Sequence, residues 1–140
     1  MDSVFTRIIH GEIPCFKIAE TQDSIAFLDI RPLSKGHTLV VPKREVDRLF
    51  DLPADQFKSL WAFGQIVAKA IEAKISCNRV GVAVLGFEVT HAHVHLVPLR
   101  SEGDLNFALP KLQLSDDEML EIADSISREY EIMIKKKIYL

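Results

Sequence analysis

The sequence predicts an α+β protein in which an antiparallel sheet of about five strands carries two main helices. Three observations predict this class. Five short runs rich in β-branched and aromatic residues are separated by Gly, Pro and polar turn residues. Two longer segments repeat apolar residues with the period of a helix. Because strands and helices do not follow one another in the regular β-α-β order of a parallel sheet, antiparallel pairing is the expected arrangement.

The N-terminal elements are expected to be a short helix and three strands. Ser3 is a suitable N-cap for a short helix, which is expected to end at Gly11. Residues 15–20 alternate around apolar side chains and residues 24–30 are an apolar run of strand formers, so these two segments are expected to pair. The Pro and Gly of residues 31–36 indicate a turn, and residues 37–42 follow as a strand closed by proline.

The second half of the chain supplies both main helices and the last two strands. Beyond Pro53, apolar residues recur to position 75 with helical spacing, which predicts about five turns with one buried stripe. Residues 80–85 and 91–99 are expected as strands. Ser115 and Glu118 have the spacing of a capping box, which opens a helix that extends at least to Tyr130.

Length and charge indicate one small domain over residues 1–140. A chain of 140 residues, 48% hydrophobic and 26% charged, can bury one proper core and is too short for two ordinary domains. The formal net charge of −3, with both signs interspersed, argues against a nucleic-acid polymer as partner, because phosphate-backbone binding requires a basic face. A mononucleotide or another small phosphate ester remains compatible with this composition.

Cysteine usage and the absence of targeting signals predict a cytoplasmic protein. Cys15 and Cys77 are far apart and in no C-x-x-C pattern, so neither a disulfide framework nor a cysteine zinc site is expected. The first residues lack a basic segment followed by an apolar run, and no segment approaches 18 uninterrupted apolar residues. No membrane association is therefore expected.

The most informative segment for chemistry places three histidines at alternate positions, His91, His93 and His95. In an extended strand these side chains leave one face, while the intervening apolar side chains leave the other. Imidazole attacks electrophiles as the free base and donates a proton or hydrogen bond as the cation. The row therefore predicts a reaction surface, with nucleophilic catalysis or phosphate binding as its chemistry.

A metal site is the alternative that the spacing leaves open. Histidine is the commonest metal ligand, and an i, i+2 pair on a strand can chelate zinc. The outer α-carbons of His91 and His95 lie roughly 13 Å apart in a strand, so binding of all three to one ion would be strained. A pair of these histidines with a remote ligand remains possible on spacing alone.

Several segments in the same order resemble the histidine-triad nucleotide-binding superfamily, in particular the bacterial HIT-like hydrolases close to its purine nucleoside phosphoramidase branch. Its signature, His-x-His-x-His followed by two apolar residues, is met by His91–Val97. The resemblance covers nearly the whole chain. The other matching segments are Val4–Ile9, Gly11–Pro14, Ala26–Pro32 and Gly36–Lys43.

The resemblance implies a nucleotide hydrolase or nucleotidyl transferase that attacks the α-phosphate and uses no cofactor. His93 matches the nucleophile that forms a covalent nucleotidyl-histidine, and His95 matches the residue that contacts phosphate and leaving group. His91 and His37 match a supporting pair that orients these two imidazoles. Without the resemblance, His37 would be interpreted as a structural residue beside a glycine turn.

The resemblance also implies a nucleoside site. Asp29 matches an aspartate that accepts hydrogen bonds from both ribose hydroxyls, although by sequence alone it could be an ordinary turn residue. A purine is expected to lie against Phe5, Leu28 and Ile30, which by pattern alone could equally be core residues. Glu88 lies in the segment before the triad, where it is expected to contact the substrate.

Two departures from the family pattern bear on function. Gly86-Phe87-Glu88 replaces the Gly-Gln that many relatives carry before the triad, which removes an amide near the phosphate. Several bacterial relatives bind zinc through a Cys-x-x-Cys whose positions are Ser3 and Thr6 here, so no structural metal is expected.

The sequence therefore predicts a cytoplasmic hydrolase of nucleoside 5′-phosphoramidates that binds a purine mononucleotide or nucleotide conjugate and forms a homodimer, as most of this family do. Three alternatives remain: an enzyme that cleaves dinucleoside polyphosphates or transfers nucleotidyl groups, a nucleotide-binding protein with little turnover, and a histidine–metal protein.

Overall fold

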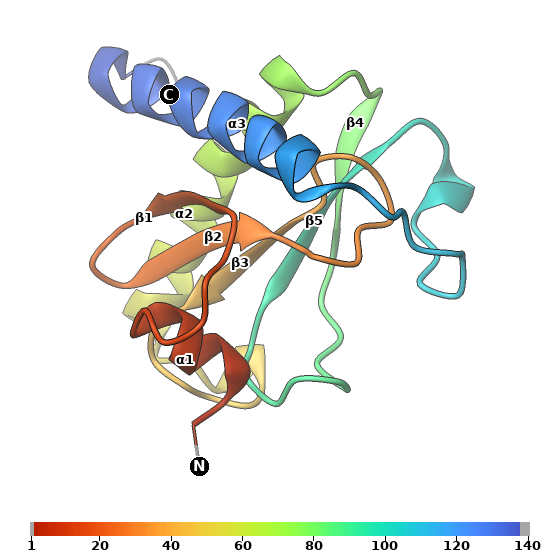
Figure 1. Cartoon of the computed structure of the whole chain (residues 1–140). Helices are drawn as coiled ribbons and strands as arrows, with labels where there is room; N and C mark the ends of the chain where they lie inside the picture. The colour runs from red at the N-terminus through yellow and green to blue at the C-terminus, as the bar shows by residue number, and fades with distance from the viewer. Residues whose placement is uncertain (1, 138–140) are drawn as a thin grey trace.

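A five-stranded antiparallel sheet with three helices forms the structure, a computed structural model that describes residues 2–137 (Figure 1). Met1 and residues 138–140, the ends of the predicted domain, lie outside the described residues. The strand order is β1-β2-β3-β5-β4, and every neighbouring pair is antiparallel. This confirms the predicted α+β class. The main elements are α1 Val4–Ile9, β1 Lys17–Glu20, β2 Ser24–Leu28, β3 Thr38–Pro42, α2 Ala54–Lys74, β4 Arg79–Ala83, β5 Val94–Leu99 and α3 Asp116–Lys136.

The elements are positioned as predicted, although several strands are shorter. Strand β5 begins at Val94, so His91 and His93 lie in the extended segment that leads into it. Ser3 caps α1 by accepting a hydrogen bond from the Thr6 backbone N–H. Ser115 and Glu118 form the expected capping box at the start of α3. Two short 3₁₀ helices that were not predicted span Leu49–Asp51 and Glu102–Asp104.

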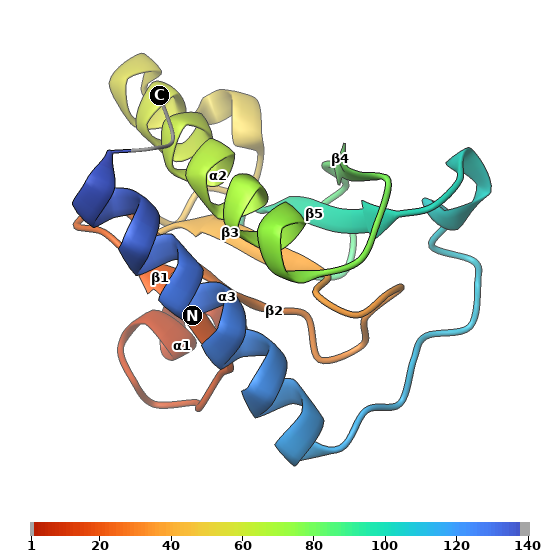
Figure 2. The ribbon, with the colours of Figure 1, turned by 90° about the horizontal axis from the view of Figure 1, so that it is seen from above.

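The sheet separates two hydrophobic clusters, and this division creates the site. Helices α2 and α3 bury their apolar stripes on one face, against side chains such as Ala26, Val40, Val94 and Leu96 (Figures 1 and 2). Alternation along the strands sends their neighbours to the opposite face, where α1 adds Phe5. Because α1 is only six residues long, it leaves part of this second face free for ligand.

The turn before His37 has to be tight for the chain to enter β3 at the next residue. Gly36 has a φ of +92°, and a Cβ there would lie 2.9 Å from the Ile75 side chain, so both backbone conformation and space require glycine. No helix among residues 2–137 is long and apolar enough to cross a membrane.

Candidate active site

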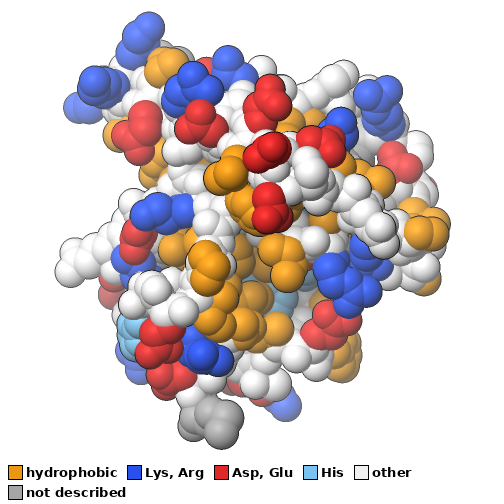
Figure 3. Space-filling model, in the orientation of Figure 1, with side chains coloured by type: hydrophobic (Ala, Val, Ile, Leu, Met, Phe, Trp, Pro, Cys, Tyr) orange, Lys and Arg blue, Asp and Glu red, His pale blue; other side chains and the backbone are white. Residues whose placement is uncertain are grey.

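A cavity of about 570 Å³ opens on the face of the sheet that α2 and α3 leave uncovered. Its wall is formed by α1, the end of β2, the segment 84–90 and the loop that follows β5. Hydrophobic side chains surround a hollow in which histidine is visible (Figure 3). The volume lies within the usual range for small-molecule sites.

His93 presents a free ring nitrogen to this cavity. Its Nδ1 lies 2.7 Å from the backbone carbonyl oxygen of His91. Because a carbonyl only accepts hydrogen bonds, Nδ1 carries a proton, and in the neutral ring Nε2 therefore keeps its lone pair. The ring is 7% exposed and lines the cavity. Thus His93 is held in the tautomer that a nitrogen nucleophile requires.

His37 and His95 form a buried hydrogen-bonded pair. The Leu33 backbone N–H donates to His37 Nδ1 over 3.0 Å, so the proton of neutral His37 resides on Nε2. That Nε2–H donates to His95 Nδ1 at 2.9 Å. The proton of neutral His95 is therefore on Nε2, and this nitrogen is a hydrogen-bond donor.

Burial keeps this pair neutral. Desolvation, assisted by the nearby Lys111 ammonium, lowers the pKa of His37 to about 4. Desolvation likewise lowers the pKa of His95 to about 4, with His93 and His37 contributing. Asp29 Oδ2 lies 3.6 Å from His37 Nε2, but with neutral His37 this contact is not an ion pair. Close to neutral pH, His95 therefore donates a hydrogen bond without carrying charge.

His91 is fully buried and anchors the segment that holds His93. Its Nε2–H donates to the Pro42 carbonyl over 2.8 Å, and its Nδ1 accepts from the Ser3 hydroxyl at 2.7 Å. The Thr6 hydroxyl beside it donates to Glu45. Ser3 and Thr6, the two positions where the sequence predicted no zinc ligands, surround this imidazole with hydroxyl groups, which are poor zinc ligands.

The wall of the cavity contains the residues that were predicted to bind the nucleoside. Phe5, Asp29, Ile30 and Glu88 all line it. Asp29 is also the turn residue that its sequence position suggested, because its Oδ1 accepts from the Arg31 backbone N–H at 2.9 Å, and burial raises the pKa of its carboxyl group. Ile30 is 74% exposed at the cavity mouth.

Leu28 differs from the other predicted base contacts. It borders the cavity, but its side chain is 2% exposed and belongs to the cluster beneath α2 and α3. Strand alternation instead turns its neighbour Phe27 toward the site, where its ring lies 5.6 Å from that of Phe5 between centroids. Sequence reasoning missed Phe27, although the period of two along β2 could have identified it.

Phe107 and Lys111 also line the cavity and were not predicted. They lie after the triad in a loop without regular hydrophobic periodicity, so only the fold brings them to the site. Phe87, the residue that departs from the family pattern, is 90% exposed at the cavity wall.

One group of side chains among residues 2–137 could hold a metal ion, because its ligand atoms lie within 4.8 Å of one another. This group consists of Asp29, His37 and His95. The hydrogen bond between His37 Nε2 and His95 Nδ1 occupies both facing nitrogens. A metal would have to displace this bond and the Nε2 proton of His37. The donor set is thus better suited to the hydrogen-bonded imidazole pair.

Comparison with known proteins gives consistent results. The HIT domain model matches residues 10–102. The chain is 35% identical over 130 residues to adenosine 5′-monophosphoramidase hnt1 of Schizosaccharomyces pombe, covering 91% of this chain and 97% of that protein. It is 31% identical over 117 residues to adenylylsulfatase HINT3 of Arabidopsis thaliana, covering 80% and 59%. Among solved structures, a Zn-bound histidine triad family protein from Mycobacterium smegmatis superposes with a TM-score of 0.81 at 28% identity, covering 97% and 98%.

Proposed function

The chain belongs to the HIT domain family, and from this premise we propose that it acts as one domain over residues 1–140 that hydrolyses nucleoside 5′-phosphoramidates, with amides of AMP as substrates. The observation that carries the proposal is that His93 lines a cavity of nucleotide size while its Nδ1 is engaged by a carbonyl, which leaves Nε2 of the neutral ring to act as nucleophile. The printed name of the fission yeast relative, adenosine 5′-monophosphoramidase, supports the same reaction class.

The first step is attack of His93 on phosphorus. A bond forms from Nε2 to the α-phosphorus while the phosphorus–nitrogen bond to the leaving amine breaks, which produces a covalent nucleotidyl-histidine. The hydrogen bond from Nδ1–H to the His91 carbonyl supports the positive charge that develops on the ring. The amine leaves with a proton taken from solvent, because His95 is held neutral with its single proton on Nε2.

His95 stabilises the charge on the phosphoryl group. Its Nε2–H is oriented by the hydrogen bond from His37, so it donates to a non-bridging oxygen without reorganisation. In the second step water attacks phosphorus and the bond to His93 breaks with its electron pair returning to Nε2. One proton of the water stays on the phosphate of the released AMP and the other passes to solvent. Neither step uses a metal or another cofactor.

The nucleoside occupies the side of the cavity next to α1. Phe5, Phe27 and Ile30 provide apolar surface for a purine, and Asp29 accepts hydrogen bonds from the ribose hydroxyls. Oδ2 of Asp29 is available for this role, because Oδ1 is the atom engaged by the Arg31 backbone. Glu88, whose charge raises the pKa of Asp29, contributes to the polar rim.

The two alternatives, a dinucleoside polyphosphate hydrolase and a nucleotide-binding protein with little turnover, make different predictions for the purified protein. We expect AMP release from an adenosine phosphoramidate at a kcat/KM at least about tenfold above that for a diadenosine polyphosphate, because the proposed reaction breaks a phosphorus–nitrogen bond to an amine. Chromatographic measurement of AMP decides between the two enzymes. AMP binding without release from either substrate would instead favour a binding protein with little turnover.

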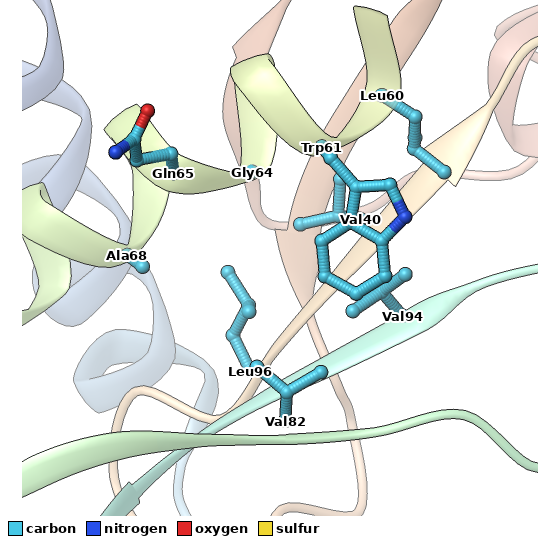
Figure 4. A pocket seen from close by; sticks show the side chains of 9 residues that line it. All are labelled: Val40, Leu60, Trp61, Gly64, Gln65, Ala68, Val82, Val94 and Leu96. Atoms are coloured by element: carbon cyan, nitrogen blue, oxygen red, sulfur yellow. The ribbon is translucent and has the colours of Figure 1, made fainter. Parts of the chain in front are cut away.

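We also propose that the protein is a homodimer formed through β4 and the adjoining face of α2. Strand β4 is an edge of the sheet, and Val82 on it is 46% exposed. Beside it lies an apolar hollow of about 190 Å³ between the strands and α2, bordered by Trp61 (Figure 4). The indole N–H of Trp61 is buried without a hydrogen-bond partner among residues 2–137. A second copy would cover this edge and could supply an acceptor.

Val82→Glu is expected to convert this dimer into a monomer, because a charge would be buried at the edge that pairs. Sedimentation velocity at micromolar concentration measures the change. Leu120→Glu on α3, at a residue 57% exposed and away from this hollow, serves as the matched control and should leave the dimer intact. A monomeric wild-type protein under the same conditions would refute the assembly.

Finally, we propose that the enzyme works in the cytoplasm. Both Cys15 and Cys77 are free thiols, as the sequence predicted, and reduced cysteines are typical of that compartment.

A further inference from the structure

A network of polar side chains joins α1 to the segment that leads into β5. It consists of Ser3, Thr6, Glu45 and His91, and none of these four side chains lines the cavity. The proposed reaction uses the backbone carbonyl of His91, which accepts the hydrogen bond from the ring of His93. Whatever holds His91 in place therefore also bears on the nucleophile.

Glu45 ties the start of α1 to the loop that follows β3. Its Oε1 accepts one hydrogen bond from the Thr6 hydroxyl and another from the Ser3 backbone N–H at 2.9 Å. The bond from Thr6, assisted by that from Ser3, lowers the pKa of Glu45 to about 2, so the side chain is a carboxylate at neutral pH. Because both donors belong to the start of α1, a single carboxylate oxygen fixes the turn on which Phe5 lies.

The same turn holds the imidazole of His91. The Ser3 hydroxyl accepts a hydrogen bond from the Thr6 backbone N–H at 3.0 Å and contacts His91 Nδ1 at 2.7 Å. Since Nε2–H of His91 donates to the Pro42 carbonyl, Nδ1 of the neutral ring is the acceptor and Ser3 is the donor. The carboxylate oxygen of Glu45 lies 3.7 Å from Nδ1, so the serine provides the hydrogen-bonded link between them.

The backbone of the loop after β3 fastens the stretch between the first two histidines of the triad. The Ala92 N–H donates to the carbonyl of Val46 at 2.7 Å. The Phe5 ring, on the first turn of α1, makes edge-to-face contacts with the rings of His93 and His91, at centroid distances of 5.0 Å and 5.7 Å. This loop, α1 and the triad segment therefore meet around the nucleophile.

We propose that Glu45 is a positioning residue for the nucleophile. Its carboxylate fixes the first turn of α1, and through Ser3 and His91 it holds the His93 ring in the orientation that attack requires. The inference rests on the proposed phosphoramidase reaction for its effect on turnover, but not for its effect on the His93 ring itself. Because a small misplacement of a reacting group costs a large factor in rate, loss of this support should slow the chemical step far more than it weakens nucleotide binding.

Glu45→Ala is expected to lower kcat for an adenosine phosphoramidate by about tenfold to a hundredfold. The dissociation constant of AMP, measured by calorimetric titration, should rise by no more than about threefold, because Phe27, Asp29 and Ile30 lie outside α1. Glu45→Gln keeps an oxygen that can accept both hydrogen bonds and should stay within about threefold of the wild-type kcat. Asp47→Ala, which removes an exposed carboxylate from the same loop, is the matched control and should change neither quantity.

Nitrogen NMR of the ligand-free protein distinguishes positioning from a loss of stability. The nitrogen-15 chemical shifts of the His93 ring report which nitrogen carries the proton, and the neutral ring of the wild type should have a protonated Nδ1 and an unprotonated Nε2. In folded Glu45→Ala the tautomer with its proton on Nε2 should also be populated, because the His91 carbonyl is no longer held opposite Nδ1. Glu45→Gln should restore the wild-type pattern.

Thr6→Val approaches the same contact from its other side and serves if Glu45→Ala does not fold. It removes one of the two donors to the carboxylate and should lower kcat by about threefold to tenfold. The double variant should lose little more kcat than Glu45→Ala alone, because both changes break the same hydrogen bond.

A folded Glu45→Ala protein with wild-type kcat, or one in which the His93 tautomer is unchanged, would overturn the positioning role. Equal losses of kcat and AMP affinity would overturn it as well, since they would show that Glu45 supports binding. A wild-type protein that releases no AMP would overturn the proposed function, whereas the tautomer of His93 in Glu45→Ala and Glu45→Gln would still decide whether Glu45 positions the ring.

Discussion

His93→Ala is expected to lower turnover of an adenosine phosphoramidate by at least about a thousandfold, because it removes the nitrogen that forms the bond to phosphorus. AMP should still bind within a few-fold of the wild-type affinity, since most of the proposed nucleoside contacts come from Phe5, Phe27 and Asp29. Steady-state assays of AMP release and calorimetric titration with AMP measure the two quantities. Mass spectrometry of acid-sensitive adducts, quenched early in turnover, should find a nucleotidyl group on the wild-type chain and none on the variant.

The control for this variant is His10→Ala, which removes an exposed histidine that does not line the cavity. It should keep wild-type turnover and the adduct. A His93→Ala protein that folds normally and retains wild-type turnover would show that the nucleophile is misassigned. Equal losses of turnover and AMP affinity would instead indicate that the ring serves ground-state binding.

The fold was predictable because its signals are local. Hydrophobic periodicity identified both main helices, and Ser3 and Ser115 cap α1 and α3 where the sequence indicated. Boundaries were less well predicted, as the start of β5 illustrates. His91 and His93 alternate like strand residues, but the backbone N–H between them, that of Ala92, donates to the Val46 carbonyl outside the sheet, and regular pairing begins only at Val94.

The site was predictable only where a motif marks it. His93, His95 and Asp29 stand in segments with a recognisable pattern, and all three line one cavity. Phe107 and Lys111 could not be predicted, because the path of an irregular loop depends on tertiary hydrogen bonds such as Leu112 N–H to Pro32. The protonation pattern was also beyond the sequence. It follows from which backbone group faces each ring, for example Leu33 N–H facing His37.

This protonation pattern makes the free energy of unfolding depend strongly on pH. The pKa values of His37 and His95 are lowered to about 4 in the folded protein, against about 6.5 for an unfolded histidine. Between these values the unfolded chain binds more protons than the folded one, so stability must fall as the pH decreases. The stabilisation is fully present above the unfolded pKa and is lost progressively below it.

We therefore expect the unfolding free energy to decrease by roughly 1 kcal/mol for each of these two imidazoles between pH 7.5 and pH 5.5, or by roughly 2 to 3 kcal/mol for the pair. Urea titrations at fixed protein concentration across this window measure it. Burial also lowers the pKa of His91, which adds a contribution of the same sign. Few carboxylates titrate above pH 5.5, so the histidines should dominate the slope.

Two variants test whether the pH dependence of the unfolding free energy comes from the buried pair His37 and His95. His95→Gln removes one titrating ring from the pair and should reduce the pH dependence by roughly the share of one imidazole, whatever it does to stability itself. His10→Gln removes a surface histidine and should leave the dependence unchanged. An unfolding free energy that stays constant from pH 7.5 to pH 5.5 would mean that His37 and His95 take up protons in the folded protein. Their hydrogen bond could then not fix the proton of His95 on Nε2, and the oriented donor on which the phosphoryl chemistry depends would be lost.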